Sequence, residues 1–427
     1  MEATDRMKKI YYGWVIVGVG LFAKMAGLGF GRFGYPMLLP KMREALHFTY
    51  TQMGLISGAI LLGYLLFSLI GGILATRFGA KKVLLASLLC GSISMFSLSG
   101  LSDFVILLFC AFGMGAGAAG THISLTVIPM AWFGKRLLGR AVGIVVGGTG
   151  LAIIVTGLLL PPLLTSFGNE GWRACWVLMA SIALVVLVIS SILVRDKPNP
   201  KKTSLREDGE MNQVTASRGK GDEFSLRTIF LVYFIFGFAY NIYVTYYVSF
   251  LVGDRGLEEK TAGFIWSIFG WMSIVSGLLW GFVSDRLGRR SALLWNNGLI
   301  SVALILPLCF HQAFLLGLSS FLFGLTFLGT VTIIAAAVGD QAFENKASVY
   351  GFLTLIHGIG QLLGTTLGGY LKDMTGSFRW TLLCSLAGFL LCCIYTGLAR
   401  NHPSPACRPG PESGRGEQAR GSHPTRL

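Results

Sequence analysis

Twelve apolar stretches occupy most of this 427-residue chain, and each is long enough to cross a lipid bilayer. A helix needs about 20 apolar residues to cross a hydrocarbon core roughly 30 Å thick. Hydrophobic residues make up 53% of the chain and charged residues only 13%, which is not the balance of a soluble domain. The sequence predicts an all-α polytopic membrane protein with twelve transmembrane helices. The predicted spans are residues 11–36, 52–75, 82–101, 103–128, 141–164, 173–194, 228–251, 263–283, 291–310, 313–336, 349–371 and 380–398.

The formal net charge of +15 is concentrated in alternate loops. If the N-terminus lies in the cytoplasm, the inner loops and termini hold 26 of the 35 Lys and Arg residues, whereas the outer loops hold 7. This is the positive-inside pattern of membrane proteins, so the basic character does not indicate a nucleic-acid partner. It predicts a multi-pass protein of the plasma (inner) membrane with both termini cytoplasmic. We expect the lipid bilayer as its surroundings and a monomeric state.

A polar segment after the sixth span divides the chain into two halves that repeat each other. The run GILATRFGAKK at 72–82 is echoed by GFVSDRLGRR at 281–290, about 209 residues later. Such a parallel repeat predicts two pseudo-symmetric six-helix bundles with a substrate site between them. The predicted domains are an N-terminal bundle (1–196), a cytoplasmic linker loop (197–227), a C-terminal bundle (228–398) and a disordered cytoplasmic tail (399–427).

The second copy of this repeat resembles the loop signature of the major facilitator superfamily, and the resemblance extends over roughly residues 10–398. It implies a transporter in which the loop joins cytoplasmic helix ends in the outward-open state. Thr76 stands where the first copy would carry the acid, so the resemblance implies an N-terminal gate that is weaker or differently built. The alternative is that the basic residues only anchor the loops in the cytoplasm. The implied gating residues are Arg77, Lys81, Lys82, Asp285, Arg286, Arg289 and Arg290.

Two further runs point to particular branches of the superfamily. Residues 132–141 (WFGKRLLGRA) and the run Tyr12-Gly13-Trp14 are similar to sequences in the oxalate/formate antiporter and monocarboxylate transporter branches. Both branches carry an arginine in the eighth span, where this chain has Gly277. The oxalate/formate branch has a lysine before a glycine in the eleventh span, where this chain has His357. The resemblance therefore implies the superfamily and leaves the branch within it open.

Lys24 and Arg32 lie inside the first span, and no span carries an acidic residue near its middle. A charge at membrane depth costs about 2.5–3.5 kcal/mol by insertion scales, so it normally faces a partner or a wet cavity. The two cations are eight residues apart, about 80° around an α-helix, and can share one broad face. A bound anion is the predicted partner. The alternatives are that Arg32 extends toward the membrane surface and that Lys24 bonds to helix carbonyls.

The other candidate substrate-binding residues are polar or aromatic side chains within predicted spans. The imidazole of His357 can carry a proton without a carboxylate, or it can be a neutral ring bonded to a neighbouring helix. The tyrosines of the seventh span share a face and offer hydroxyl donors, or they form an interfacial aromatic belt. Small residues beside His122 instead favour tight packing there. The candidates are His122, Tyr240, Asn241, Tyr243, Tyr247, His357 and Gln361.

These features predict a secondary transporter of a small organic anion, a mono- or dicarboxylate, that works by alternating access. Coupling by proton symport, through His357 or the proton of the substrate, and coupling by anion exchange both remain open. The alternatives are an efflux transporter for an amphiphilic drug or metabolite and a non-transporting membrane sensor. The sequence has no P-loop, no nucleophile–base constellation and no cysteine spacing typical of a metal site, so we expect neither an enzyme nor a cofactor or metal.

Overall fold

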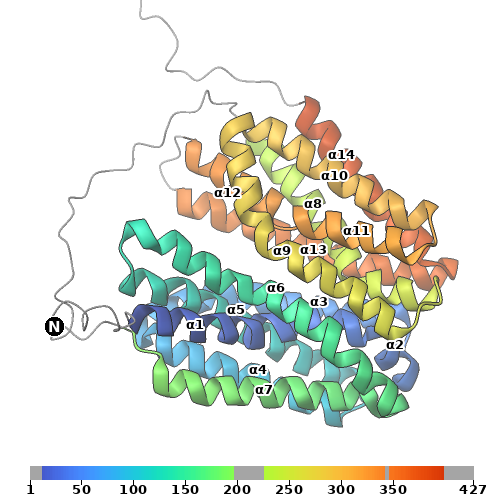
Figure 1. Cartoon of the computed structure of the whole chain (residues 1–427), viewed down its shortest axis with the longest axis horizontal. Coiled ribbons are helices and arrows are strands. Elements are labelled where there is room, and N and C mark those ends of the chain that lie inside the picture. The colour runs from blue at the N-terminus through green and yellow to red at the C-terminus, as the bar shows by residue number, and fades with distance from the viewer. Residues whose placement is uncertain (1–11, 197–225, 342–345, 399–427) are drawn as a thin grey trace, which may run out of the picture.

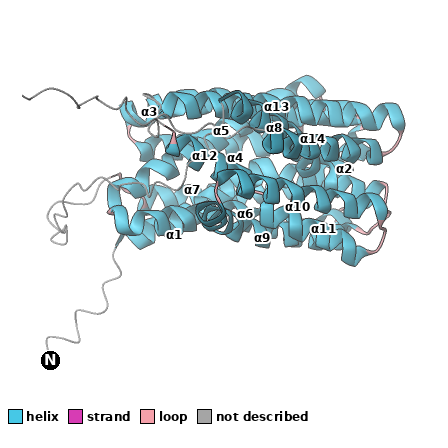
Figure 2. Ribbon diagram, turned by 90° about the horizontal axis from the view of Figure 1, so that it is seen from above, coloured by secondary structure: helices cyan, strands magenta, loops and turns pink. Residues whose placement is uncertain are grey.

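The computed structural model describes residues 12–196, 226–341 and 346–398. These residues form helices and connecting loops, without a strand (Figure 2). The helices are α1 (Tyr12–Lys24), the π-helix η2 (Met25–Gly34), α2 (Tyr35–Leu46), α3 (Tyr50–Phe78), α4 (Ala80–Gly100), α5 (Phe104–Trp132), α6 (Lys135–Ser166), the short 3-10 helix η3 (Gly168–Glu170), α7 (Gly171–Leu193), α8 (Leu226–Gly253), α9 (Glu259–Leu287), α10 (Arg289–Cys309), α11 (Ala313–Thr326), α12 (Gly329–Asp340), α13 (Lys346–Thr375) and α14 (Phe378–Leu398).

These elements make twelve membrane-length segments. Eleven are long and apolar enough to cross a membrane; α1, η2 and α2 together form the first of them, and α11 with α12 forms the tenth segment of the chain. The remaining membrane-length helix is α13, the eleventh segment in chain order, which has 30 residues. Two polar side chains, His357 and Gln361, lie near its middle.

The first segment is longer than the sequence predicts. Its predicted end is near residue 36, but the helix continues through α2 to Leu46. Pro36 does not stop the helix because it lies in the first turn of α2, directly after the π-helix, where a missing backbone N–H costs little. The extension carries Lys41 to the other half of the molecule, where its Nζ lies 3.2 Å from Glu259 Oε1.

Elements α1–α7 and α8–α14 form two bundles that lie against each other (Figure 1). Their internal packing repeats. The contact of α3 with α5 recurs as α9 with α11, that of α4 with α7 as α10 with α14, and that of α1 with α6 as α8 with α13. The bundles meet most extensively through two further pairs, α6 with α9 and α3 with α13, and α2 also packs against α8. The predicted fold of twelve helices in two pseudo-symmetric bundles is confirmed.

The predicted domain boundaries stay a prediction. The linker predicted at 197–227 lies outside the described residues, except for its last two residues, which begin α8. The predicted tail, 399–427, also lies outside the described residues.

Glycines allow α6 and α9 to touch backbone to backbone where the bundles meet. A Cβ atom added at Gly157 would lie 2.4 Å from the Gly263 carbonyl oxygen, and one added at Gly263 would lie 2.3 Å from the Gly157 carbonyl oxygen. Gly150 and Gly270 face each other in the same way, with both distances at 2.8 Å. These separations are too short for any side chain, so the close approach of the bundles requires glycine on both helices.

A carboxylate of one bundle caps a helix of the other at the face where α2 connects to α3, which we call the connecting face. Asp373, near the end of α13, accepts hydrogen bonds from the backbone N–H groups of Tyr50 (2.9 Å) and Thr51 (2.7 Å). It also accepts one from the Thr51 hydroxyl at 2.6 Å. Negative charge at a helix N-terminus is favourable, so this contact holds the bundles together at the connecting face.

We expect Asp373→Ala to loosen the connecting face without unfolding either bundle. Loss of a capping side chain costs about 0.5–2 kcal/mol, and here that loss falls on a contact between bundles. The distance between spin labels at positions 47 and 256, on the two bundles, should become longer or more broadly distributed.

Asp103→Ala is the matched control, because Asp103 caps α5 within its own bundle by accepting from the Ile106 N–H at 3.0 Å. It should leave the label distance unchanged. An unchanged distance in Asp373→Ala would show that the cap does not hold the bundles together.

Candidate functional site

The two cations of the first span lie on either side of an unusual helical segment. Lys24 is the last residue of α1, and Arg32 lies within the π-helix η2. π-helical segments are rare in proteins, and those that do occur are frequently found at functional sites. Glycine is required here: a Cβ at Gly29 would lie 2.1 Å from the Ala152 Cβ, and one at Gly27 would lie 2.5 Å from the Thr121 hydroxyl oxygen. The sequence therefore brings the first span into close contact with α5 and α6 at the depth of the cations.

Arg32 reaches from the first bundle to two side chains of the second. Its Nη2 donates to the Tyr240 hydroxyl on α8 at 2.5 Å and to Gln361 Oε1 on α13 at 2.7 Å. Its Nε is buried and has no hydrogen-bond partner in the structure. The ion pairs among the described residues do not include Arg32. The guanidinium is thus held between the bundles by neutral groups, with its charge uncompensated by a carboxylate.

A small cavity lies beside Arg32 between the bundles. Its volume is about 10 Å³, which is room for about one water molecule. Ser57 of α3 and Asn241 and Thr245 of α8 give it a polar lining. Ligand sites usually measure roughly 300–1,000 Å³, so an organic anion can enter only if the surrounding helices move.

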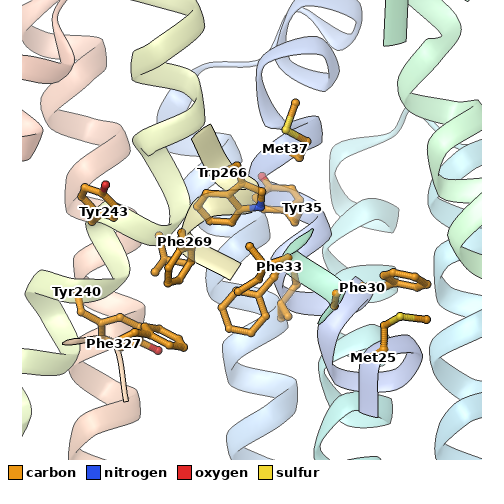
Figure 3. Packing of buried hydrophobic residues seen from close by; sticks show 14 of the residues in the cluster. Met25, Phe30, Phe33, Tyr35, Met37, Tyr240, Tyr243, Trp266, Phe269 and Phe327 are labelled. Carbon is orange, nitrogen blue, oxygen red and sulfur yellow. The ribbon is translucent and has the colours of Figure 1, made fainter. Parts of the chain in front are cut away.

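Aromatic rings next to Arg32 close the interface on its apolar side. Figure 3 shows the rings of Phe33, Phe269 and Phe327 turned toward one another, with Tyr240 beside Phe327. The Phe33 and Phe327 rings are 5.9 Å apart, and the Phe269 and Phe327 rings are 5.0 Å apart. These edge-to-face contacts join η2 to α9 and to the break between α11 and α12. The candidate site therefore combines one fixed cation with an apolar wall.

His357 is fixed within a stack of aromatic rings. Its ring centroid lies 4.3 Å from that of Tyr233 and 5.6 Å from that of Tyr240, with nearly parallel planes. Its Nδ1 lies 3.2 Å from the Tyr233 carbonyl oxygen, which can only accept a hydrogen bond. This geometry matches the alternative of a neutral imidazole bonded to a neighbouring helix. His357 contacts Tyr240, a partner of Arg32, rather than Arg32 itself.

The tyrosines predicted on one face of the seventh span point to different partners. Tyr240 reaches Arg32, but the Tyr243 hydroxyl lies 3.0 Å from Ser319 Oγ, and the Tyr247 hydroxyl donates to the Leu316 carbonyl at 2.7 Å. Both partners are on α11, so α8 presents Tyr243 and Tyr247 to its own bundle rather than to Arg32. Asn241 is nearer the site, because its amide donates to the Gln361 carbonyl at 3.4 Å.

Lys24 is paired with His122 of α5. Its Nζ lies 2.6 Å from His122 Nδ1. Lys24 is only 3% exposed, and His122 is partly buried. The sequence analysis gave helix carbonyls as the alternative partners of Lys24 and tight packing as the alternative role of His122. Neither alternative includes this pairing. The structure thus brings Lys24, Arg32, His122, Tyr240, Asn241 and Gln361 to the centre of the molecule.

The second signature loop forms a network within its own bundle. Arg289 Nη1 donates to Asp285 Oδ1 at 2.6 Å, and Arg289 Nε donates to Asp340 Oδ2 at 2.7 Å. Arg290 Nη2 donates to the Gly397 carbonyl at 2.5 Å, and Arg286 lies over the Phe282 ring. The loop therefore ties α9, α10, α12 and α14 together at one end of the second bundle.

The first signature loop is differently built, as its Thr76 implies. The missing acid is replaced in space by Asp196, which follows α7 and accepts from the Lys81 N–H at 2.7 Å. Lys81 Nζ donates to the Ser191 carbonyl at 2.8 Å. Arg77 and Lys82 are exposed. Sequence analysis missed Asp196; the available signal was an acid directly after the sixth span.

Comparison with known proteins agrees with this architecture. The model of the family described as "Uncharacterised MFS-type transporter YbfB" matches residues 24–396. The hexuronate transporter of Bacillus subtilis (strain 168) is 28% identical over a 404-residue alignment. The match covers 87% of this chain and 90% of that protein. A probable sulfoacetate transporter, SauU, of Cupriavidus necator is 24% identical over 373 residues, 81% of this chain and 84% of that protein.

Among solved structures, the chain resembles a bacterial homologue of the human lysosomal transporter Spinster in an inward-facing and occupied conformation. The TM-score is 0.73 at 16% identity, and the match covers 92% of this chain and 97% of that one. The predicted resemblance to the major facilitator superfamily is confirmed.

Proposed function

The chain belongs to the family described as "Uncharacterised MFS-type transporter YbfB", and we propose that it transports a small organic anion, a mono- or dicarboxylate, by alternating access. It is a multi-pass membrane transporter of the major facilitator superfamily rather than an enzyme. The two sequence relatives described above are named for hexuronate and sulfoacetate, which are both organic anions. Their names support the anion class and leave the substrate itself open.

The observation that carries the proposal is the set of partners around Arg32. Its guanidinium touches both bundles, and those partners are a hydroxyl and an amide oxygen rather than a carboxylate. A guanidinium binds a carboxylate through two parallel hydrogen bonds, about twice as strong as those between neutral groups. An entering carboxylate would replace Tyr240 and Gln361 as acceptors. These two side chains would then be free to donate to other substrate oxygens, which makes the bound anion a link between the bundles.

The distribution of Lys and Arg residues supports an orientation of the protein in the membrane. With both termini in the cytoplasm, 26 of the 35 Lys and Arg residues lie on the inner side. The positive-inside rule therefore supports cytoplasmic termini and a plasma (inner) membrane location. The connecting face then lies outside, and the structure represents a state that is closed to the outside. We infer that the protein acts as a monomer.

A ligand screen tests the proposed function. Purified protein should unfold at a higher temperature with D-galacturonate, sulfoacetate, tartrate or lactate than with an uncharged sugar. A ligand at 100 times its Kd adds about 2.7 kcal/mol to the free energy of unfolding, which is readily measured. Stabilisation by an amphiphilic cation alone would favour drug efflux and contradict the proposal.

The signature loops are proposed as conformational gates, and Asp285 gives a test. Asp285 is 70% exposed and pairs with Arg289 within one bundle, so its ion pair is worth at most about 1 kcal/mol. We expect Asp285→Asn to slow transport by roughly two- to fivefold while leaving the Kd for the substrate unchanged. Transport rates in proteoliposomes and calorimetric binding on the same preparation measure the two quantities. Equal transport rates would mean that the loop is only a topological anchor.

A further inference from the structure

Lys24 and His122 form an isolated pair of basic groups at membrane depth. The pair joins α1 to α5 through a 2.6 Å contact between Nζ and Nδ1. None of the ion pairs among the described residues includes Lys24. An ammonium normally has a carboxylate partner when it is buried, and here its partner is a second base. Both nitrogens can bind a proton, and one lies within hydrogen-bond distance of the other.

The groups around the pair supply no negative charge. The rings of Tyr64 of α3 and His122 form an edge-to-face contact with centroids 6.2 Å apart, and the guanidinium of Arg32 of η2 lies over the Tyr64 ring, 5.7 Å from its centroid. The α6 helix contributes Gly148 against the Lys24 side chain. Neither α6 after Arg140 nor α7 between Arg173 and Arg195 carries an acidic or basic residue. The nearby charged group is therefore Arg32, which repels a proton on the pair.

Two hydroxyl groups of α5 are buried without hydrogen-bond partners in the structure. They belong to Thr121 and Ser124 of α5, the neighbours of His122 in sequence. Buried hydroxyls are nearly always satisfied, so these two mark a place where hydrogen bonding is incomplete in this state.

We propose that the Lys24–His122 pair is the proton-binding site of this transporter, and that it takes up one proton when an organic anion binds at Arg32. The proposal rests on the proposed transport function. A proton from water forms an N–H bond with the free lone pair of Lys24 Nζ or His122 Nδ1, and the other nitrogen becomes its hydrogen-bond partner. The same proton returns to water when the anion leaves. No other atom is gained or lost.

The physical reason for coupling is electrostatic. Without an anion, a proton on the pair and the fixed charge of Arg32 repel each other in a medium of low dielectric constant, where such interactions are strong. A carboxylate bound to Arg32 cancels that charge, so the pair can hold its proton. Binding of a proton and binding of the anion therefore favour each other by the same factor. A monocarboxylate would cross the membrane together with one proton, without net charge movement.

His357 is a less suitable proton carrier. Its Nδ1 faces a carbonyl oxygen, and its ring is held between tyrosine rings in the second bundle. Among the described residues, no hydrogen bond joins the His357 ring to a basic side chain, whereas His122 contacts Lys24. The site that takes up the proton thus lies in the first bundle, with Lys24 on the same membrane segment as Arg32 and His122 on α5.

Calorimetric titration in buffers of different ionisation enthalpy tests the proposal, because it reports binding and proton uptake together. The probes are D-galacturonate, sulfoacetate, tartrate and lactate, added to purified full-length protein. At a pH where the pair is free of its extra proton, the wild type should take up about one proton per bound anion. Lys24→Arg keeps the positive charge but cannot release it, so this variant should bind the anion with proton uptake near zero. His122→Gln should reduce uptake in the same way.

Lys260→Arg and His311→Gln are the matched controls, since both residues are exposed and lie outside the site. They should bind and take up protons as the wild type does. Anion binding by the wild type without proton uptake would overturn this inference alone, as would full uptake in a folded Lys24→Arg variant. Absence of binding by all four anions would instead overturn the transport function on which it rests.

Discussion

Replacing Arg32 by glutamine is expected to weaken organic-anion binding by about 1.5–3 kcal/mol, or roughly 10- to 150-fold in Kd. Glutamine retains hydrogen-bond donors near Tyr240 and Gln361 but removes the charge that balances a carboxylate. The effect should be large because Arg32 cannot lose its own proton and has no carboxylate partner among the described ion pairs. Isothermal titration with the anion that stabilises the wild type most measures the change.

One further variant separates the charge of Arg32 from the geometry of its guanidinium, and a second variant is a control. Arg32→Lys keeps the charge but loses the planar fork, so it should recover only part of the affinity. Arg140→Gln removes an exposed arginine of α6 that lies outside the site and should leave the Kd unchanged. An unchanged Kd in a folded Arg32→Gln variant would mean that Arg32 is structural, and drug efflux would then become the better hypothesis.

Enlarging Gly157 should force the bundles apart at their tightest contact. The Cβ atom of Gly157→Leu would lie 2.4 Å from the Gly263 carbonyl oxygen, which belongs to a helix backbone and cannot move alone. Overpacking costs about 1–3 kcal/mol, so a cost near 3 kcal/mol would change the ratio of closed to open molecules roughly 150-fold. A cysteine at position 57, beside the central cavity, should then react faster with an impermeant maleimide applied from the connecting face.

Gly143→Leu is the matched control on the same helix. A Cβ atom at Gly143 meets nothing within 4 Å, so this variant should label like the parent protein. Both measurements use a parent in which the eight natural cysteines are replaced. Equal labelling of Gly157→Leu and Gly143→Leu would show that the α6–α9 contact does not control access to the site.

Much of the fold could be predicted from hydropathy and repetition. Long apolar runs locate the spans, because a membrane helix must satisfy its backbone internally and expose apolar side chains to lipid. The extension of the first span to Leu46 was not predicted, because the predicted span ends at residue 36. The π-helical form of η2 was not predicted either. Gly27 and Gly29 of this segment pack closely against α5 and α6, a contact that a local sequence pattern does not contain.

The charge inventory identified the two cations at the centre of the candidate site, but not the residues that they contact. Lys24 and Arg32 stand out in sequence because charge at membrane depth is costly. Their partners come from other helices: His122 is 98 residues from Lys24, and Gln361 is 329 residues from Arg32. No pattern in one sequence gives such distances. The same reason explains why Asp373, which lies 322 residues from Thr51 and caps α3 across the interface, was missed.

Uptake by proteoliposomes tests the central claim, that this chain carries organic anions through a site built on Arg32. Vesicles containing the wild-type protein should accumulate a radiolabelled anion, D-galacturonate or the best ligand of the screen, in a saturable manner that other organic anions inhibit. Vesicles with an equal amount of folded Arg32→Gln should show uptake reduced to near the protein-free level. Equal uptake by the two proteins, or movement of an amphiphilic cation but of no organic anion, would contradict the account.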